Sequence, residues 1–356
     1  MTRGYGIPRR TESIFLLVVL IVASIMQILT THMGLLFLAW SIAGGALTLL
    51  VRLEGGETAS KPGRILQIQQ HASTVLLFGF LVFLFHCSES WILGGAVSES
   101  PANSQKAFRI MASAGIQHAS QWWPLIITVW LSFIISLRLG IVLFPFSLRR
   151  TSRRLGGAVL FVFLGVFLPT SVGAFGTLYS HMVSEVGSMI SITLGIMGAI
   201  AVFSGGLWLQ TEWRLGSMAG HVAQIFIGLG LLALARGEYE ILRFHILHMM
   251  VVLMLFSGFE LITVRTLGST DISSWDSAYL SHPWIRRLHI GLVCIVIPWP
   301  GTPAGTIWIS ALGNDFLTGG GAGLLASLGI ILLFSGLIRS FIRVIVRTHE
   351  RQSVFI

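Results

Sequence analysis

Charged side chains are scarce in this sequence: only 10% of its 356 residues are Asp, Glu, Lys or Arg. Soluble domains carry roughly 25% charged residues, so a soluble enzyme is excluded. Cysteine is almost absent too. Cys87 and Cys294 are the only two and form no Cys-x-x-Cys motif, which excludes a disulfide scaffold and an iron–sulfur cluster. Lysine occurs only at Lys61 and Lys106, so the chain lacks the residues for a mechanism that requires several lysine side chains.

The sequence contains long apolar runs that have few charged residues. The chain is 54% hydrophobic with a mean hydropathy of +0.83, and about 20 apolar residues are enough to cross a bilayer as a helix. The sequence therefore predicts ten membrane spans, at residues 13–32, 33–51, 72–94, 121–146, 156–179, 186–209, 217–234, 244–264, 288–309 and 319–338.

The predicted fold class is an all-α polytopic membrane protein with about 10 transmembrane helices. The loops between the spans are short, and the largest, 95–120 and 266–287, are too small to be independent domains. We therefore expect one transmembrane domain over residues 1–356, with N-terminal helices in 13–94 and a core in 121–342.

The basic residues are distributed unevenly between alternate loops. If the N-terminus is cytoplasmic, eighteen of the 23 Lys and Arg residues fall in inner segments, one lies within a span (Arg138), and the outer segments hold only Lys106, Arg109, Arg236 and Arg243. This bias follows the positive-inside rule and predicts that both termini are cytoplasmic. It also accounts for the net charge of +9 without nucleic acid as a partner.

No motif for a cofactor or a catalytic centre is present. The chain has no Walker motif, no Gly-x-Gly-x-x-Gly after a strand and no His-Glu-x-x-His. Gly205-Gly206 and Gly319–Gly321 lie in or beside spans, where such glycines usually serve helix packing. We therefore expect no cofactor, no metal and no catalytic centre within the chain itself.

Ionisable residues inside spans are costly and are candidates for function. They are His86, Arg138, His181, Glu185, His221, His245, His248, Glu260 and His289. His245 and His248 share one helical face by their spacing, as do His221 and Gln224 on the preceding span. With no third ligand nearby, a proton path or hydrogen bonding to a neighbouring helix is favoured over metal binding.

Arg138 falls inside the predicted span 121–146. Arginine keeps its proton, so it suits a fixed countercharge better than a proton carrier. We expect it to be buried and paired with a carboxylate, of which Glu185 is the best placed. The candidate proton path therefore comprises His221, Gln224, His245, His248, His181, Glu185 and Arg138.

Prolines fall within two spans. Pro169 is expected to break its helix, and Pro298-Trp-Pro-Gly-Thr-Pro303 is expected to interrupt the ninth span. Interrupted helices free backbone groups that can line an ion or water path, and they also occur as plain kinks. The sequence leaves both interpretations open.

The segment from Leu207 to Gly230, followed by Phe244-His-Ile-Leu-His248 and Leu255-Phe-Ser-Gly258, resembles the antiporter-like subunits of respiratory complex I and of Mrp antiporters. That family has a Ser-x-x-Gln-x-Gly helix followed by a His-rich helix ending in Leu-Phe-Leu-x-x-Gly. Looser matches follow in the same order along the chain, at Leu35–Trp40, Leu143–Phe146, Pro169–Thr170 and Pro298–Pro303. The resemblance implies the antiporter-like subunit fold, with interrupted helices. The membrane subunit of inorganic-carbon accumulation systems looks similar as well, and that likeness implies a large soluble partner on the cytoplasmic side.

The departures from this family concern its proton-carrying residues. The family's intramembrane lysines correspond here to Gly140, to Met250 or Val252, and to Trp213-Arg214, and its early glutamate corresponds to Ser41. Lysines inside helices let the usual subunit load and pass protons. The sequence therefore indicates a shortened and altered member that depends on a complex.

Three functions remain open. The first is a membrane subunit of a proton-motive-force-coupled complex, in the bacterial inner membrane, that conducts protons or supports its neighbours. The second is a purely structural assembly subunit, which the missing lysines favour. The third, an independent ion or small-solute transporter, predicts an internal repeat and a central polar site, and neither is evident. The expected partners are other subunits and the lipid bilayer.

Overall fold

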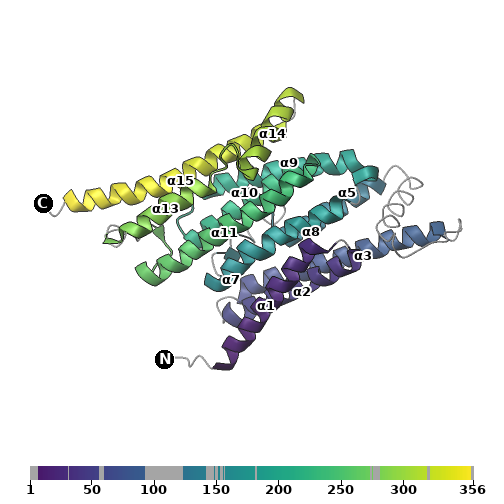
Figure 1. Ribbon diagram of the computed structural model, residues 1–356, viewed down its shortest axis with the longest axis horizontal. Coiled ribbons are helices and arrows are strands. Elements are labelled where there is room, and N and C mark those ends of the chain that lie inside the picture. Colours follow the sequence, from purple (N-terminus) through teal and green to yellow (C-terminus); the bar gives the residue numbers. More distant parts are fainter. Residues whose placement is uncertain are drawn as a thin grey trace.

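The computed structural model is a bundle of long helices (Figure 1). It describes residues 7–30, 32–55, 60–92, 123–141, 148, 151–152, 155, 157–180, 183–272, 275, 281–318 and 321–353. Over these residues the helices are α1 (Ile7–Leu29), α2 (Met33–Gly55), α3 (Ser60–Ile92), α5 (Trp123–Leu139), α7 (Gly157–Val162), the π-helical turn η3 (Phe163–Phe167), α8 (Leu168–Ser180), α9 (Val183–Leu209), α10 (Leu215–Ala235), α11 (Tyr239–Leu267), α13 (Pro283–Val296), α14 (Pro303–Thr318) and α15 (Gly321–Ser353).

Eight helical stretches of the described chain are long and apolar enough to cross a membrane. A ninth, the apolar stretch Leu125–Leu139 in α5, is shorter. Large apolar side chains such as Phe15, Val75 and Ile192 are exposed on these helices, as expected where lipid replaces water. The chain is therefore an integral membrane protein of the all-α polytopic class.

The ninth predicted span, 288–309, is not one continuous helix. α13 ends at Val296 and α14 begins at Pro303. Pro298, Pro300 and Pro303 lack the N–H that would continue the helix, and each also disfavours helical backbone in the residue before it. Gly301 takes a positive φ of 94° in this turn. The expected interruption is present, and it divides the span into two short helices.

Pro169 does not break its helix, contrary to the sequence prediction. The chain stays helical from Gly157 to Ser180, with the π-helical turn η3 directly before Leu168-Pro169. The wider turn fits the physical need here, because proline cannot donate to the carbonyl four residues earlier and its ring crowds that carbonyl. The five residues of η3 are all buried, so this adjustment lies in the core.

The predicted span 121–146 is also corrected. α5 ends at Leu139, and Gly140 follows with a positive φ of 66°. A residue with positive φ ends a helix readily when it is glycine. Arg138 therefore lies in the last turn of α5 and not in the middle of a long helix.

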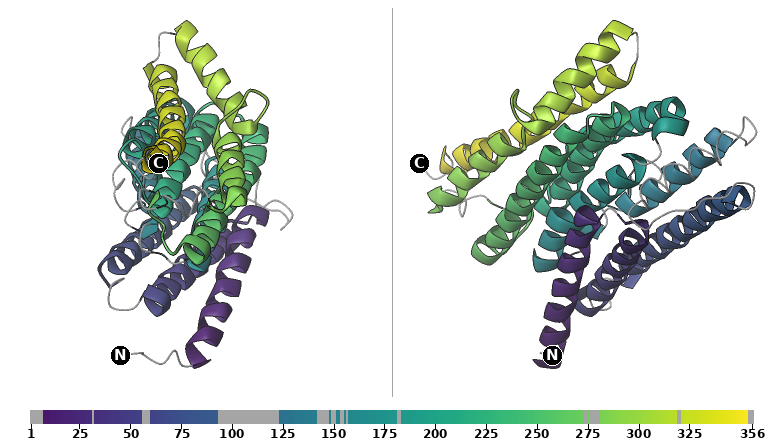
Figure 2. Two further views of the ribbon diagram at one scale, coloured as in Figure 1. Left: turned by 90° about the vertical axis from the view of Figure 1, so that its left-hand side faces the viewer. Right: turned by 45° about the vertical axis from the view of Figure 1, so that its right-hand side comes forward.

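Most helices lie side by side along a common oblique direction, with the steeper α1 at the lower edge and α14 and α15 at the upper edge of Figure 1. The right-hand view of Figure 2 shows the same order, with α9, α10 and α11 in the middle of the bundle. α9 packs closely against α10 and α15 through glycines: a Cβ at Gly198 would lie 2.7 Å from the Gly228 carbonyl oxygen, and a Cβ at Gly329 would lie 2.6 Å from that of Val202. Glycine here lets helix backbones approach.

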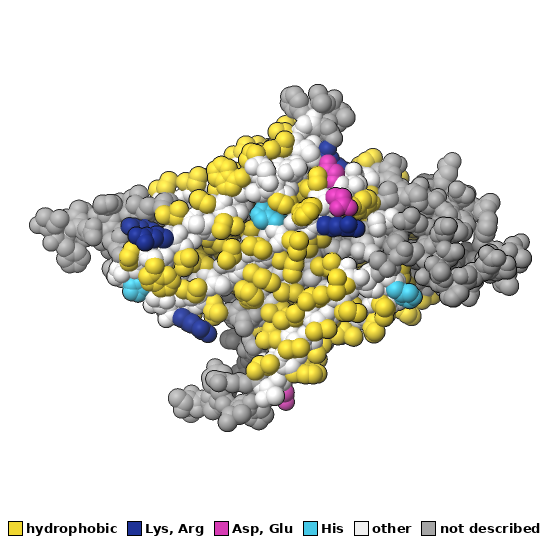
Figure 3. Space-filling view, viewed as in Figure 1, with side chains coloured by type: hydrophobic (Ala, Val, Ile, Leu, Met, Phe, Trp, Pro, Cys, Tyr) yellow, Lys and Arg dark blue, Asp and Glu magenta, His cyan; other side chains and the backbone are white. Residues whose placement is uncertain are grey.

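The helix ends gather in two groups. At one end Arg214 forms a β-bridge with Asp271, and Arg339 stacks on Trp213 with 4.6 Å between the guanidinium carbon and the ring centroid. At the other end Ser310 donates to Glu238, which pairs with Arg236. In Figure 3 the charged side chains of the visible face occupy separate zones beside a broad apolar area. These groups contain the segments that the charge bias assigns to the inner and outer sides.

The orientation of the chain in the membrane can be tested with one introduced cysteine at each end of the bundle. In a chain with Cys87 and Cys294 replaced by serine, we expect a membrane-impermeant maleimide to label Arg243→Cys in cells whose outer membrane is permeable. Arg286→Cys should react only after the inner membrane is opened. Both positions are exposed. The reverse pattern of labelling would place the termini outside.

Candidate functional site

His245 and His248 both lie against Phe226 of α10. The His245 Nε2 is 2.8 Å from the Phe226 carbonyl oxygen, and its ring stacks on the Phe226 ring with 5.7 Å between centroids. The His248 ring meets Phe226 edge-on at 5.4 Å. His245 is fully buried and His248 partly so. The structure thus brings the two histidines of α11 together around one residue of α10.

The hydrogen bond to Phe226 determines which nitrogen of His245 can accept a proton. A carbonyl only accepts, so Nε2 carries a hydrogen and donates it. The Nδ1 atoms of His245 and His248 are both buried, and neither has a hydrogen-bond partner in the described part of the chain. In the neutral ring of His245, Nδ1 is the atom able to take a further proton.

His221 and Gln224 are buried on α10 but belong to a different contact. Gln224 Nε2 donates to Ser204 Oγ of α9 at 2.7 Å, and a Cβ at Gly205 would lie 3.1 Å from the His221 carbonyl oxygen. Two residues turn a helix by about 200°, so Gln224 and Phe226 face opposite sides of α10. The structure therefore places Gln224 at the α9–α10 contact and His245 and His248 at the α10–α11 contact, and the backbone of His221 also lies against α9.

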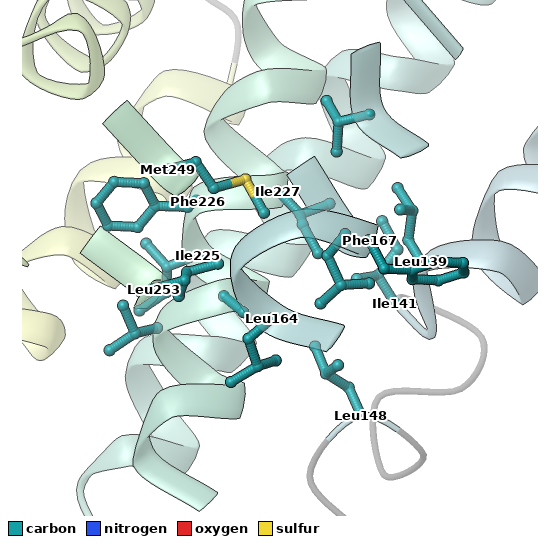
Figure 4. Close-up of a cluster of buried hydrophobic side chains, with 14 of the residues drawn as sticks. Leu139, Ile141, Leu148, Leu164, Phe167, Ile225, Phe226, Ile227, Met249 and Leu253 are labelled. Carbon is teal, nitrogen blue, oxygen red and sulfur yellow. The ribbon is translucent and has the colours of Figure 1, made fainter. Parts of the chain in front are cut away.

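The space around Phe226 is largely apolar. Figure 4 shows Phe226 beside Met249, with Ile225 and Leu253 close below them. All four are buried in the main core cluster. A proton that reaches the histidines must therefore use water or a conformational change, because apolar side chains cannot pass it on.

Arg138 is held by neutral groups. Its Nη1 donates to Gln70 Oε1 of α3 at 2.7 Å, its Nη2 to the Trp40 carbonyl of α2 at 3.1 Å and its Nε to Ser171 Oγ of α8 at 3.3 Å. Its guanidinium carbon lies 4.3 Å from the Trp40 ring centroid and 4.4 Å from that of Phe167. Arg138 therefore joins four helices, and we call this set of contacts the arginine cage.

Several predicted residues lie outside the described part of the chain. His181 and the side chains of His86 and Glu185 are among them, so the pairing of Arg138 with Glu185 stays a prediction. The backbone of Glu185 lies in the first turn of α9, whereas Arg138 contacts Ser171, nine residues before the end of α8. Nine helical residues span roughly 14 Å, so Ser171 lies about that far along the helix axis from the end of α8 that precedes α9.

Glu260 is the acidic side chain that the sequence argument named without assigning a role. Its carboxylate lies against Gly216 at the start of α10, where the helix dipole favours negative charge. Its Oε2 is buried and has no partner among the described side and main chains. A Cβ at Gly216 would lie 2.8 Å from Glu260 Oε1, so this close contact requires glycine.

His289 lies in a third group, away from α10. Its ring stacks on Phe259 at 5.5 Å and meets Trp275 edge-on at 6.0 Å. No helical spacing connects His289 with Trp275, because they lie in separate elements. Sequence patterns therefore give no signal for this contact.

No protein-family model matches the chain, and no curated protein matches its sequence. Solved structures do match its fold. A chain of the Mrp complex from Dietzia has a TM-score of 0.67 and 14% identity, over 92% of this chain and 59% of that one. A chain of respiratory complex I from Thermus thermophilus has a TM-score of 0.64 and 13% identity, over 96% and 72%. A chain of an archaeal membrane-bound sulfane sulfur reductase has a TM-score of 0.60 and 14% identity, over 95% and 73%.

The likeness extends over nearly all of this chain, although the chain spans only about three fifths of the Mrp-complex chain. Identities of 13% and 14% carry a statement about fold and not about activity. The chain therefore has the fold of the antiporter-like membrane subunits of Mrp and complex I-type assemblies.

Proposed function

We propose that the chain is a membrane subunit of a proton-motive-force-coupled complex, and that His245 and His248 pass protons between α10 and α11. The observation that carries the proposal is the pair of imidazoles at Phe226, one fully and one partly buried, each with a buried Nδ1 that has no partner in the described structure. An imidazole ring can both take up and release a proton. The fold of the Mrp and complex I chains supports the subunit role.

The proposed partners are the other membrane subunits of the complex and a peripheral subunit at the basic end of the bundle. The proposed location is the bacterial inner membrane with both termini in the cytoplasm, supported by the charge bias of the loops. Both a complex I-type assembly and an inorganic-carbon accumulation system fit this description. Proteins retained after mild detergent extraction would distinguish them.

A structural assembly subunit is the second candidate. The apolar packing around Phe226 favours this candidate. The position of the chain's only two lysines also favours it, because both lie outside the described membrane-crossing stretches. In this case the histidines serve only to hold α10 against α11. The two candidates make opposite predictions for a variant that lacks both imidazoles.

The double substitution His245→Asn and His248→Asn is expected to leave assembly intact and to lower proton-coupled activity about 100-fold, a typical contribution of a proton-transfer group. Proton uptake in inverted membrane vesicles, together with the subunit composition of the purified complex, measures both. His71→Asn is the matched control, because His71 is an exposed histidine on α3. Full activity with normal assembly contradicts the proton role, and loss of assembly favours the structural one.

A further inference from the structure

The arginine cage leaves part of the guanidinium unused. Arginine has five N–H groups, and the acceptors Gln70 Oε1, Trp40 O and Ser171 Oγ take three of them. One N–H on Nη1 and one on Nη2 remain. Arg138 is almost completely buried, so bulk water does not satisfy them.

A second donor without an acceptor, on Trp40, belongs to the arginine cage. The Trp40 Nε1 is buried, and no hydrogen-bond partner for it exists in the described part of the structure. The ring that carries this atom lies 4.3 Å from the Arg138 guanidinium carbon. Buried donors from two helices, α2 and α5, that lack an acceptor in the described structure therefore lie in contact with the same full positive charge.

The charge of Arg138 is compensated only in part. Its position in the last turn of α5 places it near the negative end of a helix dipole, which is equivalent to about half an elementary charge. The aromatic rings of Trp40 and Phe167 add a cation–π attraction. Among the residues that the structure describes, no carboxylate forms an ion pair with it. A buried cation in a membrane is normally paired.

We propose that Arg138 and Trp40 form a buried binding site for a small monovalent inorganic anion of the size of chloride or bromide. Such an anion supplies both the missing negative charge and an acceptor for the three remaining N–H donors. Water would accept the hydrogen bonds without neutralising the charge. The site is separate from the histidines of α10 and α11, and it does not depend on the proposed proton role.

The size limit follows from α2. A Cβ at Gly44 would lie 2.8 Å from Arg138 Nη1 and 3.5 Å from Gln70 Oε1, so the helix backbone approaches the guanidinium closely. Space beside Nη1 is therefore narrow, which excludes a large organic anion such as gluconate. This size selection makes gluconate the reference salt for a binding experiment.

The test is the thermal stability of the full-length chain in nanodiscs, titrated with sodium bromide against sodium gluconate at constant ionic strength. A ligand that binds only the folded state raises the melting temperature in a saturable way. We expect such a rise for the native chain. Arg138→Gln should abolish it, and Trp40→Phe, which keeps a ring over the guanidinium, should raise the half-saturating bromide concentration about tenfold.

Arg243→Gln is the matched control, because Arg243 is an exposed arginine at the outer end of α11; it should leave the titration unchanged. If Arg138→Gln does not fold, Trp40→Phe decides the question. No saturable rise in the native chain, or an equal rise in all variants, overturns the site. A rise that appears only after Glu185→Gln overturns it as well, because Glu185 would then be the partner of Arg138.

Discussion

The substitution Gly329→Val is expected to destabilise the folded bundle by about 3 kcal/mol or more, the upper part of the range for overpacked cores. A Cβ at Gly329 would lie 2.6 Å from the Val202 carbonyl carbon and oxygen and 2.7 Å from the Phe203 Cα. These are backbone atoms of α9, which cannot rotate away as a side chain can. The clash is relieved only if α15 moves away from α9 along their contact, which also includes Gly206.

Gly258→Val is the control for this prediction. Gly258 lies in the membrane-crossing helix α11, and a Cβ at this position would have no described atom within 4 Å. Both variants place the same β-branched residue in a helix, so any difference reports the close backbone contact. Melting temperatures from size-exclusion chromatography of detergent-solubilised chains measure it. Equal melting temperatures would show that α15 is free to shift away from α9.

The sequence was sufficient to predict the helical fold because hydropathy alone determines where a chain can cross lipid. Eight of the ten predicted spans correspond to long apolar helices, and the proline-rich turn at Pro298–Pro303 is where the ninth breaks. The error at Pro169 has a physical origin. Whether proline breaks a helix depends on whether the preceding turn can widen, and the turn Phe163–Phe167 does so inside a packed core.

The site was less predictable because its partners come from distant segments. The acceptors of Arg138 include a backbone carbonyl, that of Trp40, and no residue type indicates a carbonyl as a ligand. The opposite faces of α10 used by Gln224 and Phe226 follow from helix geometry, but which neighbour covers each face does not. Glu260 meets the first turn of α10 through Gly216, a contact that depends on how two helices cross.

Replacing Arg138 by methionine is expected to destabilise the bundle by about 2 kcal/mol. The change removes the hydrogen bonds to Gln70, Trp40 and Ser171, and each bond to a charged group contributes about 1.5–3 kcal/mol. It also removes the attraction to two aromatic rings, worth about 2 kcal/mol when desolvated. Against these losses stands the desolvation penalty of the cation, which is several kcal/mol and disappears with it. The lost contacts outweigh the relieved desolvation penalty by a small margin, because the cage supplies three hydrogen bonds and two aromatic contacts for one charge.

Arg138→Lys separates the charge from the geometry of the cage. Lysine keeps the cation and its desolvation penalty, but a single ammonium cannot serve acceptors on α2, α3 and α8 that a planar guanidinium reaches with three different nitrogens. We therefore expect the lysine variant to be no more stable than the methionine variant, as measured by melting temperature in the same detergent. A lysine variant as stable as the native chain would show that the charge alone is needed at this position. A methionine variant more stable than the native chain would show that the desolvation penalty outweighs the cage, and that the arginine is retained for a purpose other than stability.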